Sequence, residues 1–233
     1  LRSTTIPGLW SGWYIDVVNI LILGKGYIGS ALYSRLSIAG ECTVDWKSKA
    51  ELQYDDKRCL SDYIKNTYDV IINASGYTGR PNVDACESNR DDTWYYNVKV
   101  PGIIAETCKY HGSKLIHISS GCIYEGYEKE FTELDEPNFG LKEEHSSWYS
   151  KTKHAGELAL QATGAHIFRI RMPFCGTTSG RNIMMKLLNY DYIINEKNSV
   201  TNVEDLASFT HLFITSSTEL YSDGGIYNVV NPQ

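Results

Sequence analysis

Short apolar runs recur along the chain and alternate with stretches whose apolar positions have helical spacing. The runs cover 17–23, 42–46, 69–73, 114–119 and 166–171. Most of them are nearly continuous in apolar character, which is typical of strands buried on both faces of a parallel sheet. Helical patterns at 31–39, 91–111 and 147–163 lie between them. This alternation predicts an α/β fold with a doubly wound parallel sheet.

The pattern changes after Pro173. A Gly/Ser/Thr loop follows, then helical patterns near 182–188 and 203–215 and a late strand at 225–230. We expect these pieces to form a small lobe, residues 174–233, over the carboxyl edge of the sheet. Residues 1–16 show no clean period and are interpreted as an extension of unknown role.

Composition limits the class of protein. The 233 residues are 42% apolar and 21% charged, which suits one soluble α/β domain with a small lobe. A net charge of −6 argues against broad binding to nucleic acid or to a membrane surface. No run of 18 apolar residues and no signal-peptide pattern are present. The six cysteines show no disulfide or zinc spacing. We therefore expect a cytoplasmic protein with reduced thiols and no metal site.

A glycine-rich turn follows the first predicted strand and opens the first predicted helix. Its residues are Gly24, Lys25, Gly26, Tyr27, Ile28 and Gly29. Glycines let the backbone approach a pyrophosphate, and the helix N-terminus supplies unpaired N–H groups. The pattern therefore predicts a Rossmann-type dinucleotide-binding domain over 17–173, with 174–233 as the substrate-binding lobe.

Charged residues after the second strand bear on the choice of cofactor. Asp45 stands 21 residues beyond Gly24, the usual place of a carboxylate that binds the ribose of NAD(H). Lys47 and Lys49 follow at once and could hold a 2′-phosphate, or could simply be solvated. The choice stays open, with NADP(H) favoured.

A phenol and an ammonium are one helical turn apart at Tyr149 and Lys153. A lysine cation lowers the pKa of a nearby phenol, which suits Tyr149 as a proton donor to a carbonyl that receives hydride. Ser119 and Ser120 end the preceding strand and could orient the substrate oxygen. The alternative is a pair of surface residues on an amphipathic helix.

At this point the sequence resembles the extended short-chain dehydrogenase/reductase family over roughly 17–233. The resemblance rests on 24–29, 73–76, Ser120, and Tyr149 with Lys153. Within the family, the chain is similar to the 3,5-epimerase/4-reductases of rhamnose synthesis and to dTDP-4-dehydrorhamnose reductases. The motifs that carry this finer likeness are 73–84, 121–125, 149–153, 169–173 and Arg181-Asn182 followed by Lys186.

The resemblance implies further site residues. Ser120 stands where the family keeps its active-site hydroxyl, and Asn97 where it keeps the asparagine that supports the Tyr/Lys relay. The residues implied for the cofactor are Asn73, Ala74, Ser75, Gly76, Asn97, Tyr149, Lys153 and Pro173. The residues implied for the sugar nucleotide are Arg80, Ser120, Gly121, Cys122, Arg181 and Asn182. Either arginine could instead be a surface ion-pair partner.

Cys122 distinguishes activities within the family. Members that dehydrate sugar nucleotides carry Asp-Glu where this chain has Gly121-Cys122, whereas epimerase/reductases carry a cysteine. A 4-keto group acidifies the hydrogens at C3 and C5, so a base on one face and an acid on the other invert each centre. By resemblance Cys122 removes the proton and Lys186 returns one. The alternative is a cysteine that simply packs as a small apolar residue.

The sequence thus predicts an NADP(H)-dependent 3,5-epimerase/4-reductase of a nucleotide-linked 4-keto-6-deoxyhexose. A reductase without epimerase activity and a non-catalytic NADP-binding regulatory subunit remain alternatives. The resemblance implies a homodimer and coupling to a 4,6-dehydratase that supplies the substrate. The chain stops at Gln233 where the family continues, so we expect an incomplete lobe.

Overall fold

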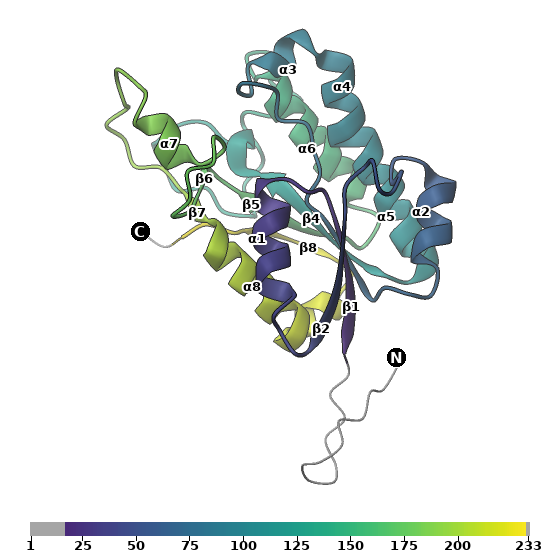
Figure 1. Cartoon of the computed structure of the whole chain (residues 1–233). Helices are drawn as coiled ribbons and strands as arrows, with labels where there is room; N and C mark the ends of the chain where they lie inside the picture. Colours follow the sequence, from purple (N-terminus) through teal and green to yellow (C-terminus); the bar gives the residue numbers. More distant parts are fainter. Residues whose placement is uncertain (1–16, 232–233) are drawn as a thin grey trace.

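Six parallel strands form the central sheet in the order β2-β1-β3-β4-β5-β8 (Figure 1). The computed structural model describes residues 17–231. The strands are β1 (Val18–Leu23), β2 (Cys42–Lys47), β3 (Val70–Asn73), β4 (Lys114–Ser120), β5 (His166–Ile170) and β8 (Gly225–Asn228). The sequence therefore predicted the α/β class and each strand of this sheet, within a few residues at the ends.

The strand order creates a crevice at the carboxyl edge. From β1 the chain moves outward to β2 and then returns past β1 to β3, so the direction of winding reverses between β1 and β3. At such a switch point the loops after the two strands separate, and ligands of doubly wound sheets bind there. The loops concerned are the glycine-rich turn and residues 74–84, which contain the predicted cofactor residues 24–29 and 74–76.

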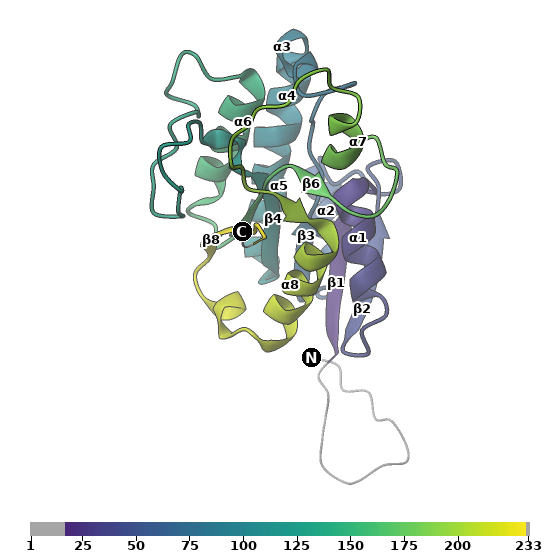
Figure 2. The ribbon, with the colours of Figure 1, turned by 90° about the vertical axis from the view of Figure 1, so that its left-hand side faces the viewer.

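Helices cover both faces of the sheet (Figures 1 and 2). Helices α1 (Tyr27–Leu36) and α8 (Val203–Ser216) pack side by side on one face. The other face carries α2 (Lys57–Ile64), α5 (Val100–His111) and α6 (Trp148–Leu160). Shorter helical segments are α3 (Ala85–Ser88), α4 (Arg90–Trp94), the π-helix η1 (Tyr95–Lys99), and the 3₁₀ turns η2 (Gly121–Ile123) and η3 (Thr218–Tyr221).

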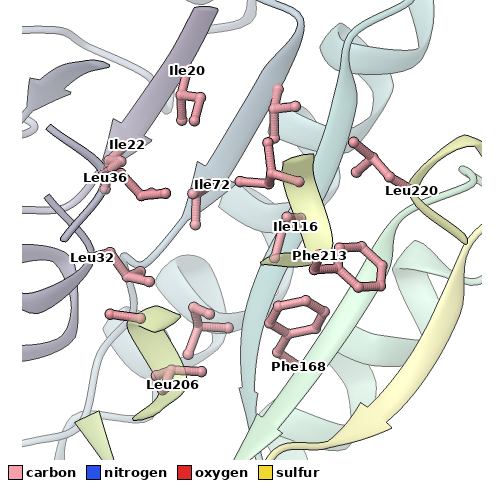
Figure 3. Close-up of a cluster of buried hydrophobic side chains, with 14 of the residues drawn as sticks. Ile20, Ile22, Leu32, Leu36, Ile72, Ile116, Phe168, Leu206, Phe213 and Leu220 are labelled. Atoms are coloured by element: carbon pink, nitrogen blue, oxygen red, sulfur yellow. The ribbon is translucent and has the colours of Figure 1, made fainter. Parts of the chain in front are cut away.

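Each face of the sheet has its own core. Alternate residues of β1 point to opposite faces, so Ile20 and Ile22 pack with α1 and α8 while Leu21 and Leu23 pack with α2 and α5. Figure 3 shows the first of these clusters, in which Phe168 lies against Phe213. Burial on both faces explains why the strands read as continuous apolar runs.

The segment between β5 and α8 lies at the carboxyl edge. It contains β6 (Pro173–Phe174), α7 (Ile183–Leu187) and β7 (Thr201–Asn202), and β6 pairs with β7 in a separate two-stranded sheet. Figure 1 shows α7 beside β6. The sequence assigned α8 and β8 to this lobe as well. Instead β8 extends the main sheet and α8 packs on α1, because both bury apolar surface against the principal core.

Two local features also differ from the sequence expectation. The single helix expected at 91–111 is interrupted by η1, and α2 was not expected. The proposed extension 1–16 lies outside the described residues. Within 17–231, no helix has both the length and the apolar character that a membrane crossing requires.

Candidate functional site

Glycine has a different physical role at each of the three glycine positions in the turn after β1. Gly24 has φ +106°, and a Cβ there would lie 2.9 Å from the backbone of Ala74 and Ser75. A Cβ at Gly29 would lie 2.0 Å from the carbonyl oxygen of Gly24. Packing therefore requires these two glycines. At Gly26 a Cβ would meet nothing within 4 Å, so this glycine opens onto free space beside the start of α1.

The loop after β3 is held in shape beside this turn. The Asn73 Oδ1 accepts hydrogen bonds from the Ser75 backbone N–H at 3.0 Å and from its hydroxyl at 2.6 Å. The Asn73 amide also contacts Nδ1 of His117 at 3.0 Å. Burial lowers the pKa of His117 well below its usual value, so its ring is neutral. A fixed loop, an open glycine and a helix N-terminus together fit the diphosphate of a dinucleotide, whose nicotinamide would supply hydride.

The structure does not place Asp45 at the end of β2. Asp45 lies opposite Leu21 in mid-strand, and its carboxylate accepts a hydrogen bond from Tyr68, which precedes β3. This position does not suit contact with a ribose at the carboxyl edge. The carboxylate beside the glycine-rich turn is Glu51, whose Oε1 lies 2.7 Å from the Lys25 Nζ.

The lysine that ends β2 and the lysine two residues later point to aromatic rings. Lys49 lies 2.6 Å from Asp55 and donates to the Tyr96 hydroxyl at 2.6 Å. Lys47 lies over the ring of Tyr63 at 5.8 Å from its centroid. Lys49 is therefore already bound within the protein.

The glycine-rich turn is joined to the carboxyl-edge segment. The hydroxyl of Tyr27 donates to Sγ of Cys175 at 3.1 Å, two residues after Pro173. Ile28 packs into the core below. Tyr27 thus links the turn to the segment that would cover a bound cofactor.

Ser120 and Tyr149 meet at the carboxyl end of β4. Ser120 is the last residue of β4, and its Oγ accepts the N–H of Cys122 at 3.2 Å. The carbonyl of Cys122 accepts a 2.6 Å hydrogen bond from Ser150, the residue after Tyr149. These contacts seat the first turn of α6 on the end of β4. Ser120, Cys122 and Tyr149 therefore form one cluster.

Burial dominates the electrostatics of Tyr149. Desolvation and the charge of Cys122 raise the pKa of Tyr149, and they outweigh the lowering by a hydrogen bond with Ser120 and by the charge of Arg181. The sequence predicted a phenol pKa lowered by Lys153, and the structure shows the reverse direction. A phenol that keeps its proton suits the task of donating it.

Lys153 lies one turn further along α6 and is almost fully buried. Its Nζ donates to the carbonyl of Ile118 at 3.2 Å. Burial lowers the pKa of Lys153 to about 8, although the charges of Glu157 and Cys122 favour the ammonium. The ammonium is thus held inside the protein against a desolvation cost.

A buried ion pair follows one turn beyond Lys153. Glu157 is 1% exposed and lies 2.7 Å from Arg169 of β5. Glu157 also accepts a 2.5 Å hydrogen bond from Ser119, while Arg169 donates to the hydroxyl of Tyr124 at 2.7 Å. These contacts fix α6 across β4 and β5. Glu157 was not predicted from the sequence, although the spacing 149, 153, 157 places it on the same helical face as Tyr149 and Lys153.

Asn97 lies in the π-helix and faces the loop after β3. Its side chain accepts from the Tyr77 N–H at 2.8 Å, donates to the Tyr77 carbonyl at 2.9 Å, and contacts the Thr152 hydroxyl at 3.1 Å. Among the contacts of the described residues, none joins Asn97 directly to Lys153. Asn97 instead holds the neighbours of the Tyr/Lys pair, and π-helical turns are frequent at functional sites.

The predicted substrate residues fall into two groups. Arg181 donates to the Gly79 carbonyl at 2.8 Å and so bridges the carboxyl-edge segment to the loop after β3. Arg80 is exposed in that loop. Asn182, in contrast, is 1% exposed, and its amide bonds to Cys175, Thr177 and Met184. Its polar atoms shape the loop before α7, which does not suit direct ligand contact.

Lys186 lies on a different element from the Cys122 cluster. It lies on α7 and is half-buried. Within residues 17–231 the structure gives no contact between Lys186 and Cys122. A cavity of about 680 Å³ opens beside Gly121, lined by Tyr124, Arg169, Arg171 and residues 126–131, and it contains none of the four predicted catalytic side chains of the β4–α6 region.

Three or more metal-binding side chains gather nowhere in the described part of the chain.

A family model described as the RmlD substrate binding domain matches residues 18–233. The chain belongs to this family. As an RmlD-type chain it shares the extended short-chain dehydrogenase/reductase resemblance that the motifs indicated.

Several relatives come from Arabidopsis thaliana, and two of them differ in the number of activities in their names. A bifunctional dTDP-4-dehydrorhamnose 3,5-epimerase/dTDP-4-dehydrorhamnose reductase is 35% identical over 92% of this RmlD-type chain and 70% of its own length. A trifunctional UDP-glucose 4,6-dehydratase/UDP-4-keto-6-deoxy-D-glucose 3,5-epimerase/UDP-4-keto-L-rhamnose-reductase is 33% identical over 92% of this chain. The match spans only 32% of that longer protein.

A solved structure has the same fold. The L780 UDP-rhamnose synthase of Acanthamoeba polyphaga mimivirus superimposes with a TM-score of 0.78 at 25% identity. The match covers 93% of this RmlD-type chain and 76% of that protein.

Proposed function

We propose that this chain is an NADP(H)-dependent 3,5-epimerase/4-reductase of a nucleotide-linked 4-keto-6-deoxyhexose, giving a rhamnose-type product. The coarser part, reduction of a 4-keto sugar nucleotide, is what the relatives' activities support. The observation that carries the proposal is the cluster of Ser120, Cys122, Tyr149 and Lys153 at the carboxyl end of β4. Strand β4, which ends at Ser120, is next to β3 in the sheet, so the cluster adjoins the crevice that fits a dinucleotide.

Reduction uses the Tyr149 hydroxyl. A bound NADPH would supply hydride to C4, and the Tyr149 hydroxyl would give its proton to O4, so that the carbonyl would become an alcohol. Ser120 orients O4 through its hydroxyl. The buried ammonium of Lys153 stabilises the tyrosinate that forms, and the raised phenol pKa keeps Tyr149 protonated beforehand.

Epimerisation uses a second proton transfer. The Cys122 thiolate takes the proton from C3 or C5, and the electron pair moves into an enolate with the C4 carbonyl. Lys186 then protonates the opposite face and inverts the centre. The residues that would supply the substrate's diphosphate with positive charge are Arg80 and Arg181.

The proposed substrate implies a second enzyme that produces it. The substrate has lost water and carries a 4-keto group, so a 4,6-dehydratase must supply it. The trifunctional relative combines a dehydratase with these activities in one protein. We place the reaction in the cytoplasm, with the chain as a homodimer and residues 174–233 on the substrate side.

The test is turnover of UDP-4-keto-6-deoxyglucose with NADPH in D₂O. We expect loss of NADPH absorbance and a UDP-rhamnose product with deuterium at C3 and C5, located by NMR. Tyr149→Phe should lower kcat by about 10²- to 10⁴-fold while cofactor binding is retained. No oxidation with UDP-, dTDP- or GDP-linked substrates contradicts the proposal.

A reductase without epimerase activity is the second candidate, favoured by relatives that are named for dTDP-4-dehydrorhamnose reduction alone. Cys122→Ala and Lys186→Ala decide between them. If wild-type protein incorporates no deuterium but reduces a pre-epimerised substrate, the single activity is correct. Loss of deuterium incorporation in both variants, with reduction retained, supports two activities.

A further inference from the structure

The carboxylate of Glu51 is gripped by three hydrogen-bond donors beside the glycine-rich turn. Its Oε1 lies 2.7 Å from the Lys25 Nζ. Its Oε2 accepts from the Ser48 backbone N–H at 2.8 Å and from the Ser48 hydroxyl at 2.7 Å. The backbone N–H and the hydroxyl of Ser48 and the ammonium of Lys25 thus converge on one carboxylate.

This contact lies where β2 ends next to β1. Lys47 pairs with Leu23, and the N–H of Gly24 donates to the Lys47 carbonyl at 2.9 Å. Ser48 therefore follows directly on the residue that holds the glycine-rich turn. In doubly wound sheets the adenosine ribose of a dinucleotide lies at this point, beside the end of the second strand.

The three donors have the chemistry of a phosphate site. A phosphomonoester accepts hydrogen bonds from ammonium, hydroxyl and backbone N–H donors. Of the two other nearby cations, Lys49 is already held by Asp55 and Tyr96, and Lys47 lies over the ring of Tyr63. Lys25 is therefore the ammonium available to an anion at this position.

The same carboxylate has opposite effects on two cofactors. A ribose with a free 2′-hydroxyl can donate to Glu51, whereas a 2′-phosphate is repelled by it and competes for its donors. The contacts with Lys25 and Ser48 hold the pKa of Glu51 at about 2, so the carboxylate stays ionised at neutral pH. Glu51 is half-exposed, with 46% of its side chain accessible, and can swing away.

We propose that Glu51 sets the cofactor preference of this chain, because its carboxylate occupies the Lys25 and Ser48 donors that a 2′-phosphate needs. NADP(H) binds by displacing Glu51 from these donors, and NAD(H) binds with Glu51 accepting from the ribose. The inference assigns the phosphate-binding task to Lys25 and Ser48 in place of Lys47 and Lys49. It rests on the proposed function only in requiring a dinucleotide in the crevice.

The test is direct titration of NADPH and NADH by calorimetry, without sugar substrate. We expect Glu51→Ala to raise affinity for NADPH relative to NADH by about tenfold, and Glu51→Gln to do so by a smaller factor. The matched control is Glu106→Gln, which breaks another exposed Lys–Glu contact, 2.9 Å from Lys57 on the helical layer. Its affinity ratio should equal that of the wild type.

A second comparison identifies the donors. In the Glu51→Ala background, Lys25→Met should remove the gain, and adenosine 2′,5′-bisphosphate should lose its advantage over ADP as a competitor. An unchanged NADPH/NADH ratio in both Glu51 variants, with unaltered circular dichroism, overturns the inference alone. Failure of the wild type to bind either dinucleotide overturns the proposed function as well.

Discussion

Lys153 shows at the residue scale how a site can cost stability. Its side chain is buried, with one hydrogen bond to a backbone carbonyl, and its pKa falls to about 8. Burial of an ammonium is unfavourable unless it is paired, and the nearest carboxylate, Glu157, is already paired with Arg169. The protein therefore holds a charge in place for chemistry.

We expect Lys153→Met to lose reductase activity yet to gain stability at pH 7. A fall of the pKa from 10.5 to about 8 corresponds to at most about 3 kcal/mol, less the hydrogen bond to Ile118. Between pH 8 and 10.5 the native wild type loses this proton before the unfolded chain does, so its stability rises with pH. Urea unfolding at several pH values should show the gap between variant and wild type narrowing. A gap that stays constant contradicts this account.

Spacing, the position after a strand and the family resemblance together predicted Ser120, Tyr149 and Lys153, because a strand end and a helical turn fix where such side chains meet. They could not decide Asp45 or Asn182, since the sequence does not reveal that Tyr68 and the 175–177 loop bind them. Partners that are distant in sequence decide whether a polar residue faces a ligand or the protein. Glu51 was not predicted for the same reason, because its partner Lys25 lies 26 residues away in the sequence.

At the scale of elements, the close approach of α6 to η1 organises the catalytic helix. A Cβ at Gly156 would lie 2.2 Å from the carbonyl oxygen of Asn97. Because that atom belongs to the backbone, a side chain at Gly156 must push the two helices apart. The π-helical turn and the glycine are therefore parts of one contact.

We expect Gly156→Ala to lower the free energy of unfolding by about 1–3 kcal/mol, as overpacking does. Gly102→Ala is the matched control, since it also lies in a helix and a Cβ there meets nothing within 4 Å. That control should be stabilising by up to about 1 kcal/mol through helix propensity. Urea melts of the two variants measure both effects, and equal stabilisation by both substitutions contradicts the packing argument.

Helices and strands were predictable from the sequence where their apolar residues recur at one regular spacing. The strands and the long helices have such spacings. Helix α2 has one too, with Leu60 and Ile64 at helical spacing after the N-cap Asp56, so it could have been predicted. The π-helical turn has no period of its own. Its insertion depends on Gly156, which lies far along the chain, so local pattern could not predict it.

At the scale of the whole molecule, an aromatic cluster joins the last elements to the sheet. Phe168 of β5 lies 5.2 Å from Phe213 of α8 and 5.6 Å from Tyr227 of β8, between ring centroids. The sequence pattern assigned α8 and β8 to a separate lobe because it follows chain order, whereas burial of these rings decides where they pack.

We expect Phe213→Ala to destabilise the whole described fold by about 3–5 kcal/mol, with one cooperative transition. Leu212→Ala is the neighbouring control on the same helix, and its side chain is 58% exposed, so its effect should stay within about 0.5 kcal/mol. Urea unfolding followed by both near- and far-ultraviolet circular dichroism makes the comparison. Two separate transitions in Phe213→Ala would indicate that α8 and β8 form an independent lobe.

The position of β8 also determines the order in which parts of the sheet can form during synthesis on the ribosome. It is the last of the six strands to leave the ribosome, and until 225–228 emerge, β5 remains an edge strand with unpaired backbone groups. Arg169 lies on that strand opposite Asn228, so its ion pair with Glu157 stays hydrated in the nascent chain. The crevice between β1 and β3 is thus complete early, whereas the support of the catalytic helix matures only at the final strand.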